Sequence, residues 1–241
     1  MIKLKKRILA LMLALSVLFC TVITYAEDPD DEDFGDDELT DEDIPFEEEE
    51  GKADFKTIAG YDTEKLVCGD FVYQKTEDGA GAVIVSYSGT EGDVTVPETL
   101  DDYPVVAIGD FAFNYQQGIE TVALPSGIVS LGNMAFFQCE NLKSIVIPDG
   151  VVKIDQNCFG GCKELESVVI PDTVQEIGTF GFLACLKLTE VRLGSGIRDV
   201  GSGAFRLCAS LSKVTIPGGD NVHVAEDSFA DCSPDIQIVR E

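Results

Sequence analysis

The chain has 241 residues, 45% of them hydrophobic, and its 44 acidic residues outnumber 17 basic ones, which gives a net charge of −27 at pH 7. So large an acidic excess argues against nucleic acid or an anionic membrane as a partner, because both are themselves negative. Beyond the first 26 residues, no segment is long and apolar enough to cross a membrane.

Residues 1–26 have the features of a secretory signal peptide. A cluster of basic residues precedes an almost unbroken apolar run from Ile8 to Ile23, and Thr24-Tyr25-Ala26 offers a small-residue cleavage site. This order predicts a cleaved signal and a secreted or extracellular surface location. The alternative is an uncleaved anchor, since about 18 apolar residues can just span a bilayer.

Residues 27–70 are predicted to be an acidic, disordered linker. Of the 24 residues in 27–50, 16 are Asp or Glu and none is basic. Such a segment cannot bury enough apolar surface to fold. A solvating spacer is therefore expected, and loose calcium binding is the alternative, although no stretch has the spaced ligands of a tight calcium loop.

Residues 71–96 are predicted to form a β-hairpin cap. Two β-rich runs, 71–73 and 82–87, are separated by the turn-forming Asp78-Gly79-Ala80-Gly81. At the start of a repeat array, a hairpin would cover the open end of the apolar stack, because terminal units need a cap for solubility.

Residues 97–241 repeat with a period of 23. Cysteines, phenylalanines and prolines each recur at this interval, and Gly194 stands where a proline is missing. The recurring residues are Cys139, Cys162, Cys185 and Cys208; Phe113, Phe136, Phe159, Phe182 and Phe205; and Pro125, Pro148, Pro171 and Pro217. A fixed period of this length predicts a solenoid, in which each coil buries its apolar face against its neighbours.

Each coil is expected to contribute one strand to a parallel sheet. The segment from Leu142 to Ile147 alternates apolar and exposed positions before a proline, as a half-buried strand does. The Ile-Gly-x-x-Ala-Phe stretch is too short for a stable helix, so a turn with a 3₁₀ or single helical turn is expected on the other face. The predicted fold class is α/β or mostly β.

The periodic cysteines are predicted to be a ladder of buried thiols. In-register residues of stacked coils lie about 4.8 Å apart with parallel side chains, whereas a disulfide requires Cβ atoms that approach and point together. Cys158 takes a slot that Ala135 and Ala204 fill elsewhere, which favours a small apolar filler over half of a zinc or redox site. The pattern leaves open whether Cys68, Cys158 or Cys232 forms a disulfide.

These Ile-Pro, Ile-Gly, Ala-Phe and Cys-x-x-Leu elements resemble the BspA-like leucine-rich repeat family of bacterial surface and secreted proteins, over about residues 71–232. The resemblance implies a curved, right-handed solenoid with its parallel sheet on the concave face and a role in adhesion or partner binding. It does not identify a ligand, because a shared fold hosts unrelated functions. No sorting motif precedes Glu241, so covalent wall attachment is not expected.

No catalytic residue, cofactor or metal site is expected. The only histidine, His223, lies in the irregular last coil and cannot complete a site of imidazoles. Gly132, Gly178 and Gly201 share one repeat position, and a turn that requires positive φ would explain them. A secreted hydrolase with paired carboxylates is the enzymatic alternative, but no such pair lies at an identifiable cleft position.

The outward positions of the predicted strands are the candidate binding surface, because a solenoid presents an extended concave face there. The expected partner is an extracellular protein, from a host, a matrix or a neighbouring cell. A purely structural spacer is the alternative. The candidate residues are Thr121, Lys143, Ser144, Val146, Glu166, Ser167, Val169, Thr189, Glu190, Arg192, Ser212, Lys213 and Thr215.

Overall fold

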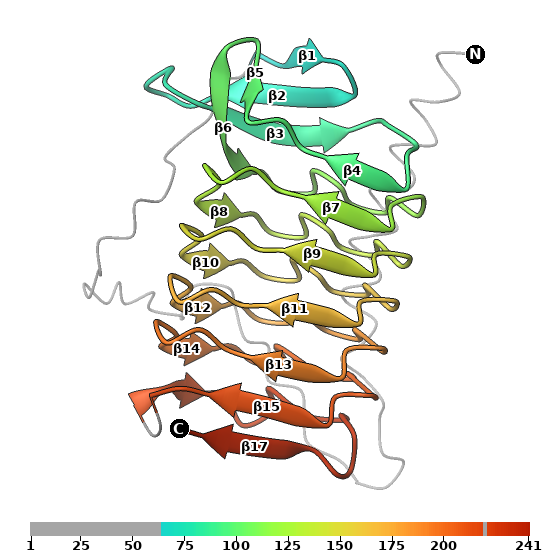
Figure 1. Cartoon of the computed structure of the whole chain (residues 1–241), viewed down its shortest axis with the longest axis vertical. Coiled ribbons are helices and arrows are strands. Elements are labelled where there is room, and N and C mark those ends of the chain that lie inside the picture. Colours follow the sequence, from blue (N-terminus) through green and yellow to red (C-terminus); the bar gives the residue numbers. More distant parts are fainter. Residues whose placement is uncertain (1–63, 219–220) are drawn as a thin grey trace, which may run out of the picture. The chain divides into compact units, whose positions relative to one another are not determined.

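In the computed structural model, residues 64–218 and 221–241 are described, and they form a stack of β-coils (Figure 1). The predicted signal peptide, and the predicted linker as far as residue 63, lie outside the described residues. Within the described residues, no helix is long and apolar enough to cross a membrane.

One face of the stack is a seven-stranded sheet in which every neighbouring pair is parallel. Its central positions carry apolar residues that point into the core, such as Ile145 and Val168. In sheet order the strands are β4 (Asp93–Thr95), β7 (Thr121–Ala123), β9 (Ser144–Val146), β11 (Ser167–Val169), β13 (Glu190–Arg192), β15 (Lys213–Ile216) and β17 (Gln237–Arg240).

A second sheet forms the other side, and the sequence pattern did not predict it. Its parallel part consists of β6 (Tyr103–Ile108), β8 (Ser130–Leu131), β10 (Lys153–Ile154), β12 (Glu176–Ile177), β14 (Asp199–Val200) and β16 (His223–Val224). Each short strand ends where a turn or 3₁₀ helix was expected to begin. Of the two predicted fold classes, the structure is therefore mostly β, and the parallel-sheet solenoid is confirmed.

The expected helical turn is wrong because two positions in most coils have left-handed backbone. The first is occupied by Phe111, Met134, Asn157, Phe180 and Gly203, and the second by Tyr115, Gln138, Gly161, Ala184, Leu207 and Asp231. All these residues have φ between 52° and 76°. A right-handed helix cannot contain such residues. The chain instead passes from the short strand to the next coil through consecutive tight turns.

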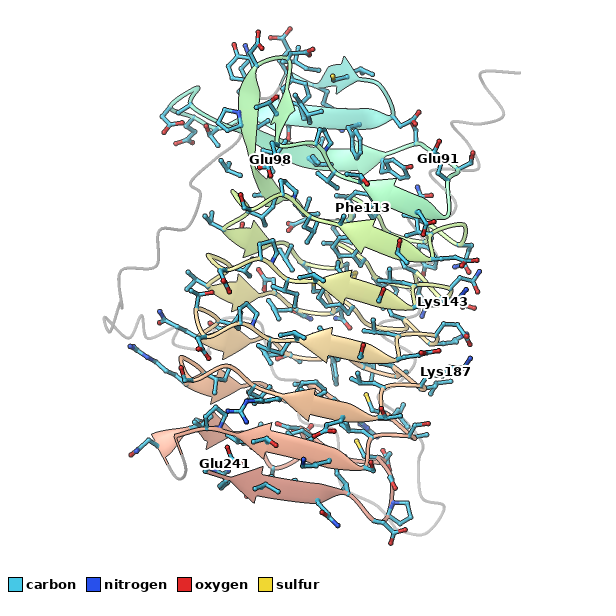
Figure 2. The ribbon with its side chains drawn as sticks, in the orientation of Figure 1. Glu91, Glu98, Phe113, Lys143, Lys187 and Glu241 are labelled. Atoms are coloured by element: carbon cyan, nitrogen blue, oxygen red, sulfur yellow. The ribbon has the colours of Figure 1, made fainter. Side chains whose placement is uncertain are left out.

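A column of aromatic rings runs through the core, as the repeated phenylalanines predict. Five successive ring pairs, from Phe113 through Phe229, are stacked with centroids 5.0 to 5.5 Å apart. Tyr87 extends the column at 5.1 Å from Phe113, and Phe71 packs on Tyr87 at 5.2 Å. Phe113 is labelled near the capped end in Figure 2. Because each coil contributes one ring, the distance between ring centroids gives the distance between successive coils.

The predicted thiol ladder is confirmed. Every cysteine among the described residues is free, and the five in the middle of the array are buried. The Cys162 Sγ donates a hydrogen bond to the Phe136 carbonyl at 3.2 Å, and Cys139, Cys185, Cys208 and Cys232 make equivalent bonds. Burial raises the pKa of the Cys139 thiol to about 12 and raises the pKa of Cys162 well above its ordinary value. These thiols are protonated core groups.

The N-terminal end carries the predicted hairpin. Strands β2 (Phe71–Lys75) and β3 (Ala82–Tyr87) are antiparallel, with Gly79 at φ 65° in the turn. A third strand, β1 (Leu66–Cys68), comes from residues assigned to the linker and pairs antiparallel with β2. Strand β3 then pairs parallel with β6, which joins the cap to the coils.

The first coil contains a second, small hairpin. Strand β5 (Thr99–Leu100) pairs antiparallel with β6 through Asp101 and Asp102, which both have positive φ. A two-residue turn of this kind matches the twist of the strands it joins. The Tyr73 hydroxyl donates to Asp101 at 2.9 Å, so the turn is attached to the cap.

Close packing between coils requires the repeated glycines, and the positive φ predicted for them is not observed. None of Gly132, Gly178 and Gly201 has positive φ. A Cβ at Gly178 would lie 2.8 Å from the Gln156 nitrogen, and one at Gly201 would lie 2.8 Å from the Thr179 nitrogen. Asp155 occupies this position in the coil between those of Gly132 and Gly178. Its N–H lies 3.2 Å from the Leu131 carbonyl oxygen, whereas the Gly178 N–H lies 2.8 Å from the Ile154 carbonyl oxygen. The side chain is accommodated by a longer contact.

Replacing Gly178 with Ala is therefore expected to lower the free energy of unfolding by about 1–3 kcal/mol, because the new methyl group overpacks against a neighbouring backbone. Gly92→Ala is the matched control, since a Cβ there would meet its neighbours at an ordinary 3.7 Å. Urea unfolding followed by circular dichroism measures both. Equal stability of the two variants would contradict the close-packing explanation.

Candidate interaction face

The candidate site is the outer surface of the seven-stranded sheet, which we call the strand face. In β9, β11 and β13 the central residue is buried and both flanking residues are exposed. The register then aligns the outward residues into columns. One contains Thr121, Ser144, Ser167, Glu190 and Lys213, and the other Ala123, Val146, Val169, Arg192 and Thr215.

The structure places eleven of the thirteen predicted residues in exposed positions. Thr121 is half-buried, and the prediction for Thr215 is wrong, because only 4% of it is exposed. Thr215 lies in register between Arg192 of β13 and Val239 of β17. An ion pair of 3.4 Å between Arg192 and Glu241 joins the two sides of β15. The flanking side chains therefore cover the smaller threonine.

A row of ion pairs connects successive coils where the strands begin. Four pairs each join residues 23 apart in sequence: Glu120–Lys143 at 2.5 Å, Glu140–Lys163 at 2.8 Å, Glu164–Lys187 at 2.5 Å and Glu190–Lys213 at 2.8 Å. Lys143 and Lys187 lie along one edge of the stack in Figure 2. Exposed pairs of this kind contribute little stability. Three predicted contact residues, Lys143, Glu190 and Lys213, are thus already paired within the chain.

Where β9, β11 and β13 end, the strand face is hollowed into a groove of about 510 Å³. Val146 and Val169 are each 70% exposed beside it, the largest such values among the bulky apolar residues described. The groove is lined by Val146, Ile147, Pro148, Asp149, Val168, Val169, Ile170, Pro171, Asp172, Arg192, Leu193 and Gly194. Three predicted contact residues, Val146, Val169 and Arg192, therefore meet at one depression.

Gly194 shapes one end of this groove. A Cβ there would lie 2.1 Å from the Pro171 carbonyl oxygen, so another residue would force the two coils apart. The Ser195 N–H donates to Asp172 Oδ1 at 2.7 Å, and this backbone hydrogen bond holds the pKa of Asp172 below its usual value. The groove thus combines an apolar surface with the Arg192 cation and a stably ionised carboxylate.

Sequence reasoning missed the groove walls, although their signal was present. Pro148 and Pro171 marked the coil boundaries, and each is followed by an aspartate. Asp149 and Asp172 line the groove together with these prolines. The sequence pattern did not reveal that each proline lies beside the outward valine of its own strand.

The side chains that could support catalysis, His223, Cys158 and Cys162, do not line the groove. His223 is exposed and pairs with Asp199 at 2.5 Å, whereas Cys158 and Cys162 are fully buried with pKa values raised by burial. A reactive thiol requires the opposite environment, one that favours the thiolate. Among residues 64–218 and 221–241, no group of three His, Cys, Asp or Glu side chains is placed to hold a metal ion.

The comparisons with known proteins agree on the repeat. The family described as BspA type leucine rich repeat region matches residues 106–234 in six copies. No curated protein matches the chain.

Solved structures of bacterial leucine-rich repeat proteins share the fold. A leucine-rich repeat protein of T. pallidum aligns with a TM-score of 0.61 at 29% identity, over 73% of this chain and 86% of that one. A leucine rich cell surface protein of Faecalibacterium prausnitzii aligns with a TM-score of 0.61 at 26% identity, over 74% of this chain and 55% of that one. The pneumococcal vaccine antigen PcpA, at 22% identity, shares the fold with a TM-score of 0.62 over 74% of this chain and 50% of its own.

Proposed function

The chain belongs to the BspA-type leucine-rich repeat family, and from that premise we propose that it is a non-catalytic interaction protein of the bacterial surface, which binds an extracellular protein through the strand face. The location is supported by the cell surface protein among its structural relatives and by the sequence of residues 1–26. Fold alone does not assign the function, so the proposal depends on the features of the face.

The observation that carries the proposal is the exposure of Val146 and Val169 beside the groove. Exposed apolar side chains on neighbouring strands beside a groove are favourable positions for a partner to bury. Arg192 lies at the same groove and its ion pair with Glu241 is exposed and long, at 3.4 Å. An acidic group of a partner can replace Glu241 at little cost, because exposed pairs contribute little.

A face of this kind fits an extended segment of protein. Successive coils repeat about 5 Å apart, as the ring spacing of the aromatic column shows. A segment that runs along the stack would meet Val146 and Val169 in turn and reach Arg192 at the next coil. The net negative charge of the chain opposes nucleic acid and anionic membranes as partners.

The test measures binding of the purified chain to fibronectin, fibrinogen and collagen surfaces by interferometry. The Val146→Lys and Val169→Lys double variant is expected to weaken binding at least tenfold, since burial of an unpaired charge is costly. Arg192→Glu should weaken it as well. Val129→Lys is the matched control, because Val129 is an exposed valine outside the strand face and the groove.

Binding that is unchanged in both strand-face variants would remove this face from consideration. Absence of binding to any of the three matrix proteins, together with normal unfolding of the chain, would favour the alternative of a structural spacer. Loss of binding in Val129→Lys to the same degree would show that the effect is not local to the face.

A further inference from the structure

The groove of the strand face has two sides of different chemistry. On its strand side, the register places Val146, Val169 and Arg192 in one column, at the ends of β9, β11 and β13. On its turn side, Asp149 and Asp172 lie in the turns that follow β9 and β11, and both are exposed. Apolar side chains and carboxylates therefore border the same groove.

The two aspartates form a repeated acidic pair. They are 23 residues apart and stand at the same position of successive coils, whose core rings, Phe159 and Phe182, have centroids 5.0 Å apart. The Ser195 N–H donates to Asp172, and this hydrogen bond lowers the pKa of Asp172, so that its carboxylate is ionised at neutral pH. The Asp149 side chain forms no hydrogen bond or ion pair with the described residues. Both carboxylates are therefore available to a cation from another molecule.

The lysines of the chain do not compensate this pair. Arg192 is the only basic residue among those that line the groove, and it stands on the strand side. The four periodic lysines pair with glutamates where the strands begin, away from the strand ends that form the groove. Lys153 of the second sheet pairs with Asp155 and Glu176. The groove therefore keeps an acidic side that a partner can neutralise.

On the basis of the proposed function, we propose that the groove binds an extended protein segment rich in lysine or arginine, which runs along the stack. The alkyl stem of each basic side chain covers Val146 or Val169, and its charged head reaches Asp149 or Asp172. Long basic side chains are suited to this, because they bury their stems on apolar surface and keep the charge at its edge. Same-face residues of an extended segment are about 6.8 Å apart, and the flexible stems make up the difference from the 5.0 Å between coils.

The charge of the chain favours this occupant over the others. A net charge of −27 attracts a cationic segment and accelerates its encounter with the groove. A second copy of the chain carries the same charge and is repelled, and an acidic segment would place its carboxylates against Asp149 and Asp172. A neutral apolar segment would cover the valines but would desolvate the two carboxylates without pairing them, which is costly.

Two synthetic peptides of opposite charge test the preference. Acetyl-Lys-Val-Lys-Val-Lys-amide and acetyl-Glu-Val-Glu-Val-Glu-amide carry the same valines, and isothermal titration calorimetry measures their binding to the purified chain. The lysine peptide is expected to bind at least tenfold more tightly than the glutamate peptide. Its affinity should fall when the salt concentration is raised from about 50 to about 300 mM, because salt screens exposed charges.

Variants locate the binding, since the remaining acidic surface also attracts a lysine peptide. Asp149→Asn combined with Asp172→Asn removes two charges and keeps an acceptor for the Ser195 N–H, and it is expected to weaken binding of the lysine peptide at least tenfold. Glu91→Gln combined with Glu98→Gln is the matched control. It removes the same charge from exposed side chains outside the groove, toward the capped end in Figure 2, and should leave the affinity within twofold.

Equal binding of the two peptides, full binding of the lysine peptide by the aspartate variant, or an equal loss in the glutamate variant would each overturn the proposal. A chain that binds a matrix protein through Val146 and Val169 but shows no preference for the lysine peptide would keep the proposed function and lose this inference. A chain that binds the lysine peptide through Asp149 and Asp172 but binds no matrix protein would support the inference and contradict only the choice of those partners.

Discussion

Phe159→Ala is expected to lower the free energy of unfolding by about 3–5 kcal/mol, the cost of removing a fully buried aromatic ring. Phe159 has no exposed surface and stacks on Phe136 at 5.3 Å and on Phe182 at 5.0 Å. A domain of ordinary stability has only about 5–15 kcal/mol in total. Because each coil of a solenoid is supported only by its neighbours, one cavity in the middle of the column weakens the coils on both sides.

Urea unfolding measures this loss, and Phe137→Ala is the matched control. Phe137 is the next phenylalanine beyond Phe136 and is only half-buried, in edge-to-face contact with Tyr115. Its replacement is expected to cost about 1 kcal/mol, which is typical for a partly exposed aromatic contact. Similar losses in the two variants would show that the stacked column does not carry the core.

The stability of the protein is expected to fall as pH rises above about 9. Burial raises the pKa of the Cys139 thiol to about 12, and it also raises the pKa of Cys158, Cys162 and Cys185. In the unfolded chain a thiol loses its proton near pH 8.5. Between these values the folded state holds more protons than the unfolded state, so rising pH favours unfolding. Below pH 8 this stabilisation is fully present.

Each such thiol contributes a loss of about 1.4 kcal/mol per pH unit within this window. Urea midpoints measured from pH 7.5 to 10.5 test the dependence. Cys162→Ala is the informative variant, because removing one thiol from the ladder should make the decline shallower even if the protein is less stable at pH 7.5. Constant stability up to pH 10.5 would contradict the assignment of these thiols as buried and protonated.

The spacing of residues in the sequence was sufficient to predict which side chains form the core. The 23-residue interval aligned Phe136 with Phe159 and Cys139 with Cys162, and in the structure the two rings are stacked and both thiols are buried. Alternation in Leu142 to Ile147 also identified which side chains of β9 point outward. These features depend on local periodicity, which is visible in the sequence itself.

The remaining features depend on contacts between coils, and the sequence of a single coil does not reveal these contacts. Beyond β6, the second sheet consists of two-residue strands such as Lys153–Ile154, too short for a pattern to identify. Gly178 is required by the backbone of the preceding coil, and Thr215 is buried by neighbours from two other strands. The groove likewise forms only when Pro148, Pro171 and Gly194 lie side by side.

The glycine, thiol and ion-pair contacts share one property, which is that each joins a residue to the adjacent coil. Glu140 meets Lys163 and Glu164 meets Lys187 in the adjacent coil, and Cys185 bonds to the Phe159 carbonyl just as Cys162 bonds to that of Phe136. Duplication or loss of a 23-residue segment would leave each surviving core thiol with an equivalent carbonyl, whereas the ion pairs stand at different positions of the repeat and would not all be kept. The length of such a protein can therefore change in evolution by whole coils, while the strand face keeps its spacing.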